Sequence, residues 1–311
     1  MPALDEYARH SAFSDPRAAT DAFLALAPEP AALQRAATAA IIHYRAYADE
    51  LVDAQAWDIE LRWLDQIAAC AQSRQPGPLD AAREPGKRVA GCCRDHTLFC
   101  LGALRSHGIP ARSRIGFCGY FAPPFHHDHV IVEWWDGTRW TRFDPELGDG
   151  PWPFDTRDIP SGVGSPFETA AEVWQELRAG RADGSTYGVA PELPELCGRE
   201  FVREYVFLEL AHRQRDELLL WDMFGASLPA GVEPVGHATF LRDDDALDAL
   251  ADEVAALLVA ADAGDGAAEA ELERRYATDA RLNPSGGVVT VSPAGRVGDP
   301  DLAARVNRWR A

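Results

Sequence analysis

The sequence predicts an α+β fold in which a helix carrying Cys93 packs on an antiparallel sheet carrying His129 and Asp144. Directly after Cys93, apolar residues recur with helical spacing. By contrast, Val, Ile and Trp are concentrated in segments 128–135 and 139–144, as is typical of strands. Amphipathic segments on both sides of this core predict extra helices towards the N- and C-termini.

The chain ahead of Cys93 is predicted to be mostly helical. Over residues 20–70, apolar residues form two stripes with a helical period, one over 33–51 and the other over 57–68. Residues 76–87 are interrupted by Pro and Gly, so we expect a loop that leads the chain to Cys93.

The helix that follows Cys93 has clear signals at both ends. Gly91 permits a tight approach into it, and Gly108 and Pro110 predict its end. Cys93 then lies at or just before the first turn. There, the helix macrodipole and free N–H groups would stabilise a thiolate, and the same N–H groups could hold an oxyanion.

A β-hairpin is predicted from the Asp-Gly pair at 136–137, a strong signal for a two-residue turn. A turn centred there pairs Trp135 with Thr138 and, counting outward, His129 with Asp144. The two side chains then lie on the same face of the sheet, with Cβ atoms about 5 Å apart. A four-residue loop would keep them on one face, whereas a three-residue loop would separate them.

The rest of the chain gives a strand, further helices and a weak domain signal. The expected elements are a strand at 111–117, a helix started by a capping box of Ser165 and Glu168, helices over 199–213 and from 243–245 onward, and a strand at 288–291. We expect residues 1–225 to form the catalytic domain with its N-terminal helices. Residues 226–311 would form a mainly helical C-terminal extension packed on the same domain.

Composition narrows the class of protein. The net charge of −19 over 311 residues argues against a nucleic-acid or anionic membrane surface. No apolar run approaches the roughly 20 residues needed to span a bilayer. Six cysteines are too few for a disulfide scaffold, and the segment from Met1 to Glu6 does not read as a secretory leader. A cytoplasmic location with reduced thiols is therefore expected.

Cys93, His129 and Asp144 together predict nucleophilic chemistry on a thiol. A thiol attacks well once a base removes its proton, and a carboxylate can fix the tautomer of that base. Cys92 is the rival nucleophile. Because neighbouring residues at a helix start point about 100° apart, only one of the two cysteines can face His129, and we expect it to be Cys93.

Three histidines within four positions also raise the alternative of a metal-dependent hydrolase that uses His126, His127 and His129. No cysteine or acidic partner stands at a familiar ligand spacing, so neither a metal nor another cofactor is predicted. An aromatic, proline-bearing loop ahead of His129 is expected to help line a substrate pocket. The expected substrate-binding residues are Tyr120, Phe121, Phe125, His126, His127 and Trp221.

The segments 91–95, 108–112, 129–133 and 144–145 resemble the core of the transglutaminase-like superfamily. Flanking pieces resemble one bacterial subgroup of transglutaminase-like domain proteins; they include Ile41-Ile42-His43-Tyr44-Arg45 and Leu220-Trp221-Asp222. One departure is Ile131, where an aromatic residue often follows the family's histidine by two positions.

The resemblance implies a papain-like core with a Cys-His-Asp triad formed by Cys93, His129 and Asp144. The implied reaction proceeds through an acyl-thioester on Cys93, resolved by water or an amine, with a small-molecule, peptide or protein acyl substrate. A non-enzymatic binding or scaffold protein on the same fold is the other alternative. The sequence does not address the oligomeric state.

Overall fold

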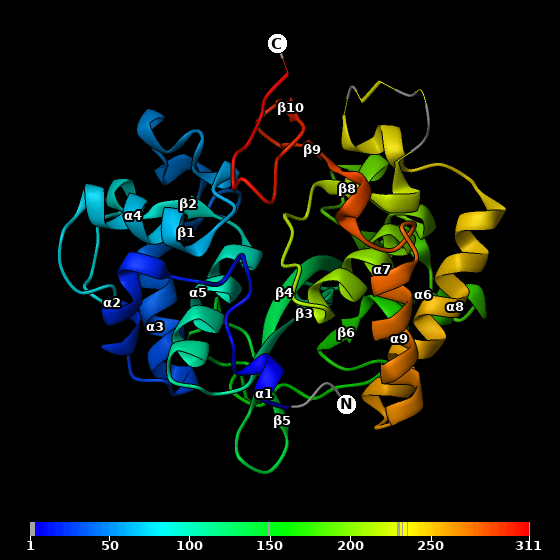
Figure 1. Ribbon diagram of the computed structural model, residues 1–311, viewed down its shortest axis with the longest axis horizontal. Coiled ribbons are helices and arrows are strands. Elements are labelled where there is room, and N and C mark those ends of the chain that lie inside the picture. The colour runs from blue at the N-terminus through cyan, green and yellow to red at the C-terminus, as the bar shows by residue number, and fades with distance from the viewer. Residues whose placement is uncertain (1–3, 149, 229–230, 232, 235, 311) are drawn as a thin grey trace.

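A central antiparallel sheet separates two groups of helices in the computed structural model (Figure 1). The structure describes residues 4–148, 150–228, 231, 233–234 and 236–310, so Met1, Pro2 and Ala3 of the N-terminal segment considered above lie outside it. The sheet runs in the order β5-β4-β3-β6, with β7 pairing parallel to β4. Its strands are β3 Ala111–Ala122, β4 Phe125–Trp135, β5 Trp140–Phe143, β6 Phe167–Thr169 and β7 Tyr187–Gly188.

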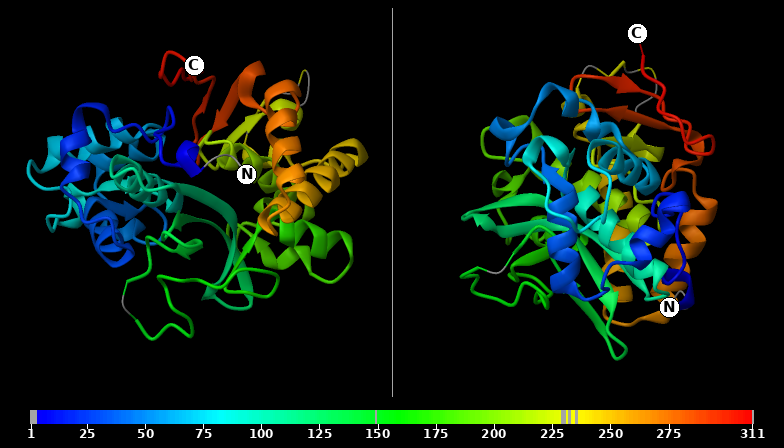
Figure 2. Two further views of the ribbon diagram at one scale, coloured as in Figure 1. Left: turned by 60° about the horizontal axis from the view of Figure 1, so that its bottom comes forward. Right: turned by 90° about the vertical axis from the view of Figure 1, so that its left-hand side faces the viewer.

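The first group of helices precedes the sheet in sequence, and the second follows it. The first comprises α1 Leu4–Tyr7, α2 Thr20–Leu24, α3 Pro30–Ala40, α4 Leu64–Arg74 and α5 Cys93–Ser106. The second comprises α6 Ala170–Arg178, α7 Arg199–Arg213, α8 Asp245–Asp262 and α9 Gly266–Thr278. In the turned view of Figure 2, left, α2–α5 and α6–α9 again lie on opposite sides of the sheet. The predicted α+β class is confirmed.

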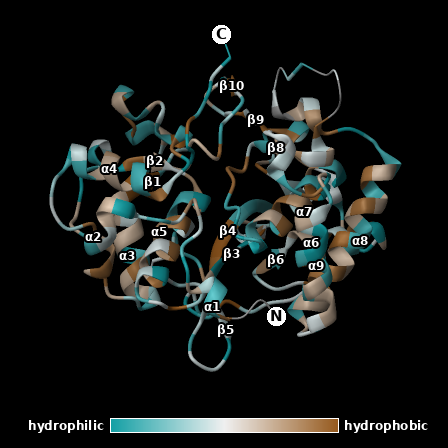
Figure 3. Ribbon diagram, viewed as in Figure 1, coloured by the Kyte–Doolittle hydropathy of each residue, from teal (hydrophilic) through white to brown (hydrophobic). Residues whose placement is uncertain are grey.

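Helix α5 lies in the centre of the core and packs against both β3 and β4. Every residue from Cys93 to Arg105 is buried, so this helix has no solvent-facing side over that stretch. The hydropathy colouring of Figure 3 shows apolar stretches of β3 and β4 between the two helical groups. The end of α5 at Ser106, just before Gly108, confirms the predicted stop. A rigid, buried helix thus fixes the position of Cys93.

The apolar stripe over 33–51 does not form one helix, so that prediction is wrong. Helix α3 ends at Ala40, and the next three residues form strand β1, Ile41–His43. It pairs in parallel with β2, Val89–Gly91, directly ahead of α5. The β-branched Ile41-Ile42 pair suits a strand, and pairing with β2 satisfies backbone groups that a continued helix would have bonded locally. This pairing brings His43 and Tyr44 beside the start of α5.

The hairpin between β4 and β5 has a register two residues away from the predicted one. Trp135 pairs with Trp140, so the loop has four residues rather than two. A type I′ turn needs positive φ at both central residues, and here only Gly137 has it, at 101°. The Asp136 carboxylate instead accepts hydrogen bonds from the backbone N–H groups of Thr138 and Arg139, at 2.7 and 2.9 Å. The parity is unchanged, so His129 and Asp144 still share a face.

The helix predicted to begin at Ser165 begins later. Thr169 is the N-cap of α6 and forms the capping box with Glu172, whereas 167–169 pairs with β3 as β6. The sequence holds two Ser/Thr-x-x-Glu patterns, and pairing with the sheet decides between them. Helix α7 has the predicted bounds, and α8 begins after an Asp244 N-cap, as predicted.

A second sheet links the C-terminal residues to the rest of the protein. Its order is β10-β9-β8, with β8 Asp222–Phe224, β9 Val288–Val291 and β10 Val297–Gly298. Strand β8 lies before the predicted boundary at 225/226 and β9 lies after it, so backbone hydrogen bonds cross that boundary. The division into 1–225 and 226–311 stays a prediction. Within the described ranges, no helix is long and apolar enough to cross a membrane.

Candidate active site

Cys93 is the first residue of α5, and Cys92 is its N-cap. The carboxylate of Asp95 accepts a hydrogen bond from the backbone N–H of Cys92 at 2.9 Å, which closes the turn. Gly91 is needed for this closure, because a Cβ there would lie 2.8 Å from Asp95 Oδ2. The predicted tight approach into the helix is present, and it presents the Cys93 thiol at the free N–H end of α5.

His129 and Asp144 form the predicted contact. Nε2 of His129 lies 2.7 Å from Oδ2 of Asp144, which is completely buried. The Tyr120 hydroxyl donates to the same oxygen at 2.5 Å, and the backbone N–H of Glu146 donates to Oδ1 at 2.8 Å. Because an ionised carboxylate only accepts, Nε2 of His129 carries the hydrogen, and Nδ1 keeps its lone pair. That tautomer is the one a base for the thiol requires.

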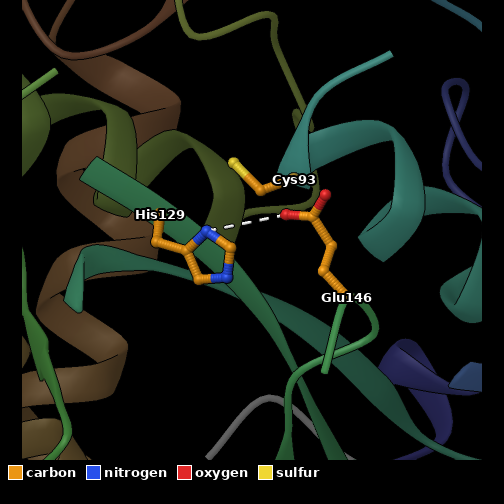
Figure 4. Close-up of side chains that lie close together, drawn as sticks. All are labelled: Cys93, His129 and Glu146. Carbon is orange, nitrogen blue, oxygen red and sulfur yellow. Dashed lines mark ion pairs between the residues drawn. The ribbon is translucent and has the colours of Figure 1, made fainter. Parts of the chain in front are cut away.

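Glu146 completes a three-residue cluster that the sequence analysis missed. The sulfur of Cys93, a ring nitrogen of His129 and a carboxylate oxygen of Glu146 all lie within 4.8 Å of one another. Figure 4 shows the three side chains gathered at this point. Oε2 of Glu146 is 3.9 Å from His129 Nδ1, and Oε1 is 3.2 Å from Nδ1 of His96. A signal was present: with a four-residue hairpin loop, counting outward puts position 146, rather than 144, opposite His129.

A comparison with protein-family models found one matching segment. Residues 45–145 match the model described as the transglutaminase-like superfamily. The chain contains a transglutaminase-like domain. The matched segment holds Cys93, His129 and Asp144 and ends one residue before Glu146. Searches of curated proteins and of solved structures gave no match.

The electrostatics of the transglutaminase-like domain favour a neutral thiol beside a strengthened base. Burial raises the pKa of the Cys93 thiol well above its usual value, and the neighbouring Cys92 and the Glu146 carboxylate raise it further. The expected thiolate at the helix start is therefore not favoured in the resting site. Burial opposes protonation of His129, but Asp144 and then Glu146 outweigh it, so the pKa of His129 is raised. His129 is thus a stronger base than a free imidazole.

A cavity of about 880 Å³ opens onto the cysteine of the transglutaminase-like domain. Its walls come from separate parts of the chain, including residues 43–47, 189–196 and 291–297. Of the six residues expected to bind substrate, Phe121, His127 and Trp221 line this cavity. A substrate role for all six stays a prediction.

The other three of these residues are placed differently. The Tyr120 hydroxyl donates to Asp144, so this side chain lies behind the pair formed by His129 and Asp144. The ring of His126 stacks on that of Tyr187, with 4.4 Å between the ring centroids. Phe125 packs edge-on against His127, with 4.9 Å between the ring centroids. Tyr120, Phe125 and His126 are not among the residues that line the cavity.

The histidines of the 126–129 segment do not converge as one group of ligands. Nδ1 of His127 donates to the carbonyl oxygen of Val189 at 2.9 Å, and His126 faces Tyr187. Only His129 belongs to a group of three potential metal ligands, and its companions there are Cys93 and Glu146. Strand alternation places His126 on the face of β4 opposite to His129, whereas His127 shares the face of His129 but uses its Nδ1 for the bond to Val189.

Proposed function

We propose that this protein is a cysteine acyltransferase or hydrolase that works through an acyl-thioester on Cys93. One observation carries the proposal: a thiol lies beside an imidazole whose far nitrogen donates to a buried carboxylate. A thiol, a base and an orienting carboxylate are the parts that nucleophilic catalysis on a carbonyl needs. The match of residues 45–145 to the transglutaminase-like superfamily supports the same chemistry.

The reaction follows from the tautomer of His129. Nδ1 takes the proton from Cys93 Sγ as the sulfur attacks the carbonyl carbon of an amide, ester or thioester. The developing oxyanion lies near the free N–H groups at the start of α5, including that of Cys93. His129 then returns the proton to the leaving group, and the acyl-thioester remains. Water or an amine then attacks the thioester carbonyl while His129 takes its proton. The C–S bond breaks, and that proton returns to Cys93 Sγ and restores the thiol.

The charge around the cavity favours cationic groups in the substrate or the acceptor. Four carboxylate side chains line its walls against two guanidinium groups, and one of these guanidinium groups is already paired, Arg45 with Glu192 at 3.1 Å. A negative cleft raises the local concentration of cations. The charged residues that line it are Asp128, Glu146, Glu192, Glu195, Arg45 and Arg296.

The test is trapping of the acyl-enzyme on the full chain. The protein is incubated with an activated aryl ester and then analysed by intact mass and by peptide mapping. We expect one acyl group on Cys93, lost in Cys93→Ser and kept in Cys92→Ser. A cationic primary amine, compared with a neutral amine of equal length, then shows whether the thioester is resolved by aminolysis or by water.

One combined result of this experiment would refute the enzyme proposal. If no acyl group accumulates or turns over on Cys93, and iodoacetamide finds no thiol that reacts faster than a free cysteine, the enzyme proposal is wrong. A non-enzymatic binding protein on this fold would then be the better description.

A further inference from the structure

We propose that Cys93, His129 and Glu146 form a binding site for one borderline-soft divalent cation, with Zn²⁺ the best match, and that the bound cation reversibly blocks the nucleophile and the base. Thiolate, imidazole and carboxylate are the three ligand types that Zn²⁺ takes in proteins. They converge here from three elements: the start of α5, strand β4 and the segment after β5. This is the one such group of three or more found in the ranges that the structure describes.

The spacing of the ligand atoms is close to what a tetrahedral ion needs. Metal–ligand bonds of about 2.0–2.3 Å place neighbouring ligand atoms roughly 3.3–3.8 Å apart. The sulfur, nitrogen and oxygen atoms of the cluster lie within 4.8 Å of one another, with the oxygen and Nδ1 of His129 at 3.9 Å. Glu146 has the most exposed side chain of the three, at 12%, so it has the most room to close the gap.

Neighbouring residues already fix the tautomer of His129 and the orientation of the Glu146 carboxylate that metal binding would require. Nε2 of His129 donates to Asp144, which leaves the Nδ1 lone pair directed at the cluster. Such carboxylate–histidine pairs are the usual outer shell of a histidine metal ligand. Oε1 of Glu146 lies 3.2 Å from Nδ1 of His96, while Oε2 faces His129. A fourth position is open to the cavity, which supplies both a water ligand and a route for entry.

Binding of the cation would stop acyl chemistry by occupying both reactive lone pairs. The Cys93 thiol releases its proton to solvent and its sulfur bonds to the metal, while Nδ1 of His129 gives its lone pair to the same ion. Neither group can then attack a carbonyl or remove a proton. Ca²⁺ and Mg²⁺ prefer all-oxygen ligand sets, so they should not compete for this site.

The test uses metal alone on the full-length protein after chelation and dialysis. Co²⁺ should give a thiolate-to-cobalt charge-transfer band, and native mass spectrometry should show one Zn²⁺ per chain. Zn²⁺, but not Ca²⁺ or Mg²⁺, should protect Cys93 from iodoacetamide. Cys93→Ser should abolish the band, Cys92→Ser should keep it, and Glu146→Gln should weaken binding at least about tenfold. Glu192→Gln is the matched control, a cavity carboxylate outside the cluster, and should bind as the unchanged protein does.

Several outcomes would overturn the inference. These are the absence of a band and of protection in the unchanged protein, a band that persists in Cys93→Ser, or equal affinity in Glu146→Gln and Glu192→Gln. Protection is read in the unchanged protein, so the test does not depend on any variant folding. The metal readouts need no turnover, so an acyl-enzyme without metal binding rejects this inference alone. Metal binding without an acyl-enzyme rejects only the proposed function.

Discussion

Replacing Asp144 by Asn tests whether the buried carboxylate sets the tautomer of His129. Three donors converge on the Asp144 carboxylate, namely His129 Nε2–H, the Tyr120 hydroxyl and the backbone N–H of Glu146. An amide keeps one acceptor oxygen and adds an NH₂ group, so it cannot satisfy all three donors in their present orientation. The change preserves volume while forcing a choice between two amide orientations.

The two orientations of the introduced amide differ in free energy because only one of them keeps the hydrogen bond from the backbone N–H of Glu146. With the oxygen at the Oδ1 position, Glu146 N–H keeps its bond and the NH₂ group faces His129, which must then move its hydrogen to Nδ1. With the orientation reversed, NH₂ opposes the partly buried N–H of Glu146, which then loses its acceptor at a cost of about 1–3 kcal/mol. The first orientation should therefore prevail by about 5- to 150-fold. It leaves no lone pair on Nδ1 for the Cys93 proton.

The assay is the second-order rate of Cys93 alkylation by iodoacetamide at neutral pH, mapped by peptide mass. Loss of the Asp144 charge also weakens His129 as a base, so the combined fall should be about 10²- to 10⁴-fold, the upper value being that of an Asp→Asn change in a serine triad. Asp128→Asn is the control. Asp128 lines the same cavity but bonds to Tyr205, so its loss should matter little. An unchanged rate in folded Asp144→Asn would refute the tautomer argument.

Four further expectations can be checked on the same protein. Cys93→Ser should abolish labelling and turnover while Cys92→Ser keeps most of both; labelling retained in Cys93→Ser and mapped to Cys92 would reverse the assignment. Tyr120→Phe removes one of the donors to Asp144 and should slow alkylation of Cys93 by about fivefold to tenfold, the equivalent of roughly 1 kcal/mol. An unchanged rate would show that this hydrogen bond does not contribute to the reactivity of the thiol. Turnover should survive treatment with a chelator, and loss of activity that Zn²⁺ or Ca²⁺ restores would contradict this. Burial lowers the pKa of His212 to about 3, so between pH 6.5 and 3 mainly the unfolded chain takes up this proton, and the free energy of unfolding falls as the pH falls. In denaturant titrations, His212→Gln should lessen that fall by up to about 1.4 kcal/mol per pH unit. The same dependence of the free energy of unfolding on pH in both proteins would count against this.

Local patterns in the sequence determined where the nucleophile, the base and the carboxylate would meet. The helical period after Cys93 and the stop at Gly108 were enough to place α5. The contact between His129 and Asp144 survived an error of two residues in register, because alternation along a strand has a period of two and the loop length changed by an even number. Features that depend on such short-range periods can be read from the sequence alone.

Tertiary structure alone decided what surrounds these three residues. Glu146 lies beyond the last pair of the hairpin, and counting outward reaches it only once the loop is known to have four residues, which the folded structure decides. The stripe over 33–51 has a helical period, yet it ends at Ala40 because β2 offers Ile41 and Ile42 a partner strand nearly fifty residues away. Cavity walls come from segments as distant as 43–47 and 291–297. Long-range pairing and burial select among local options, and the sequence pattern does not record that selection.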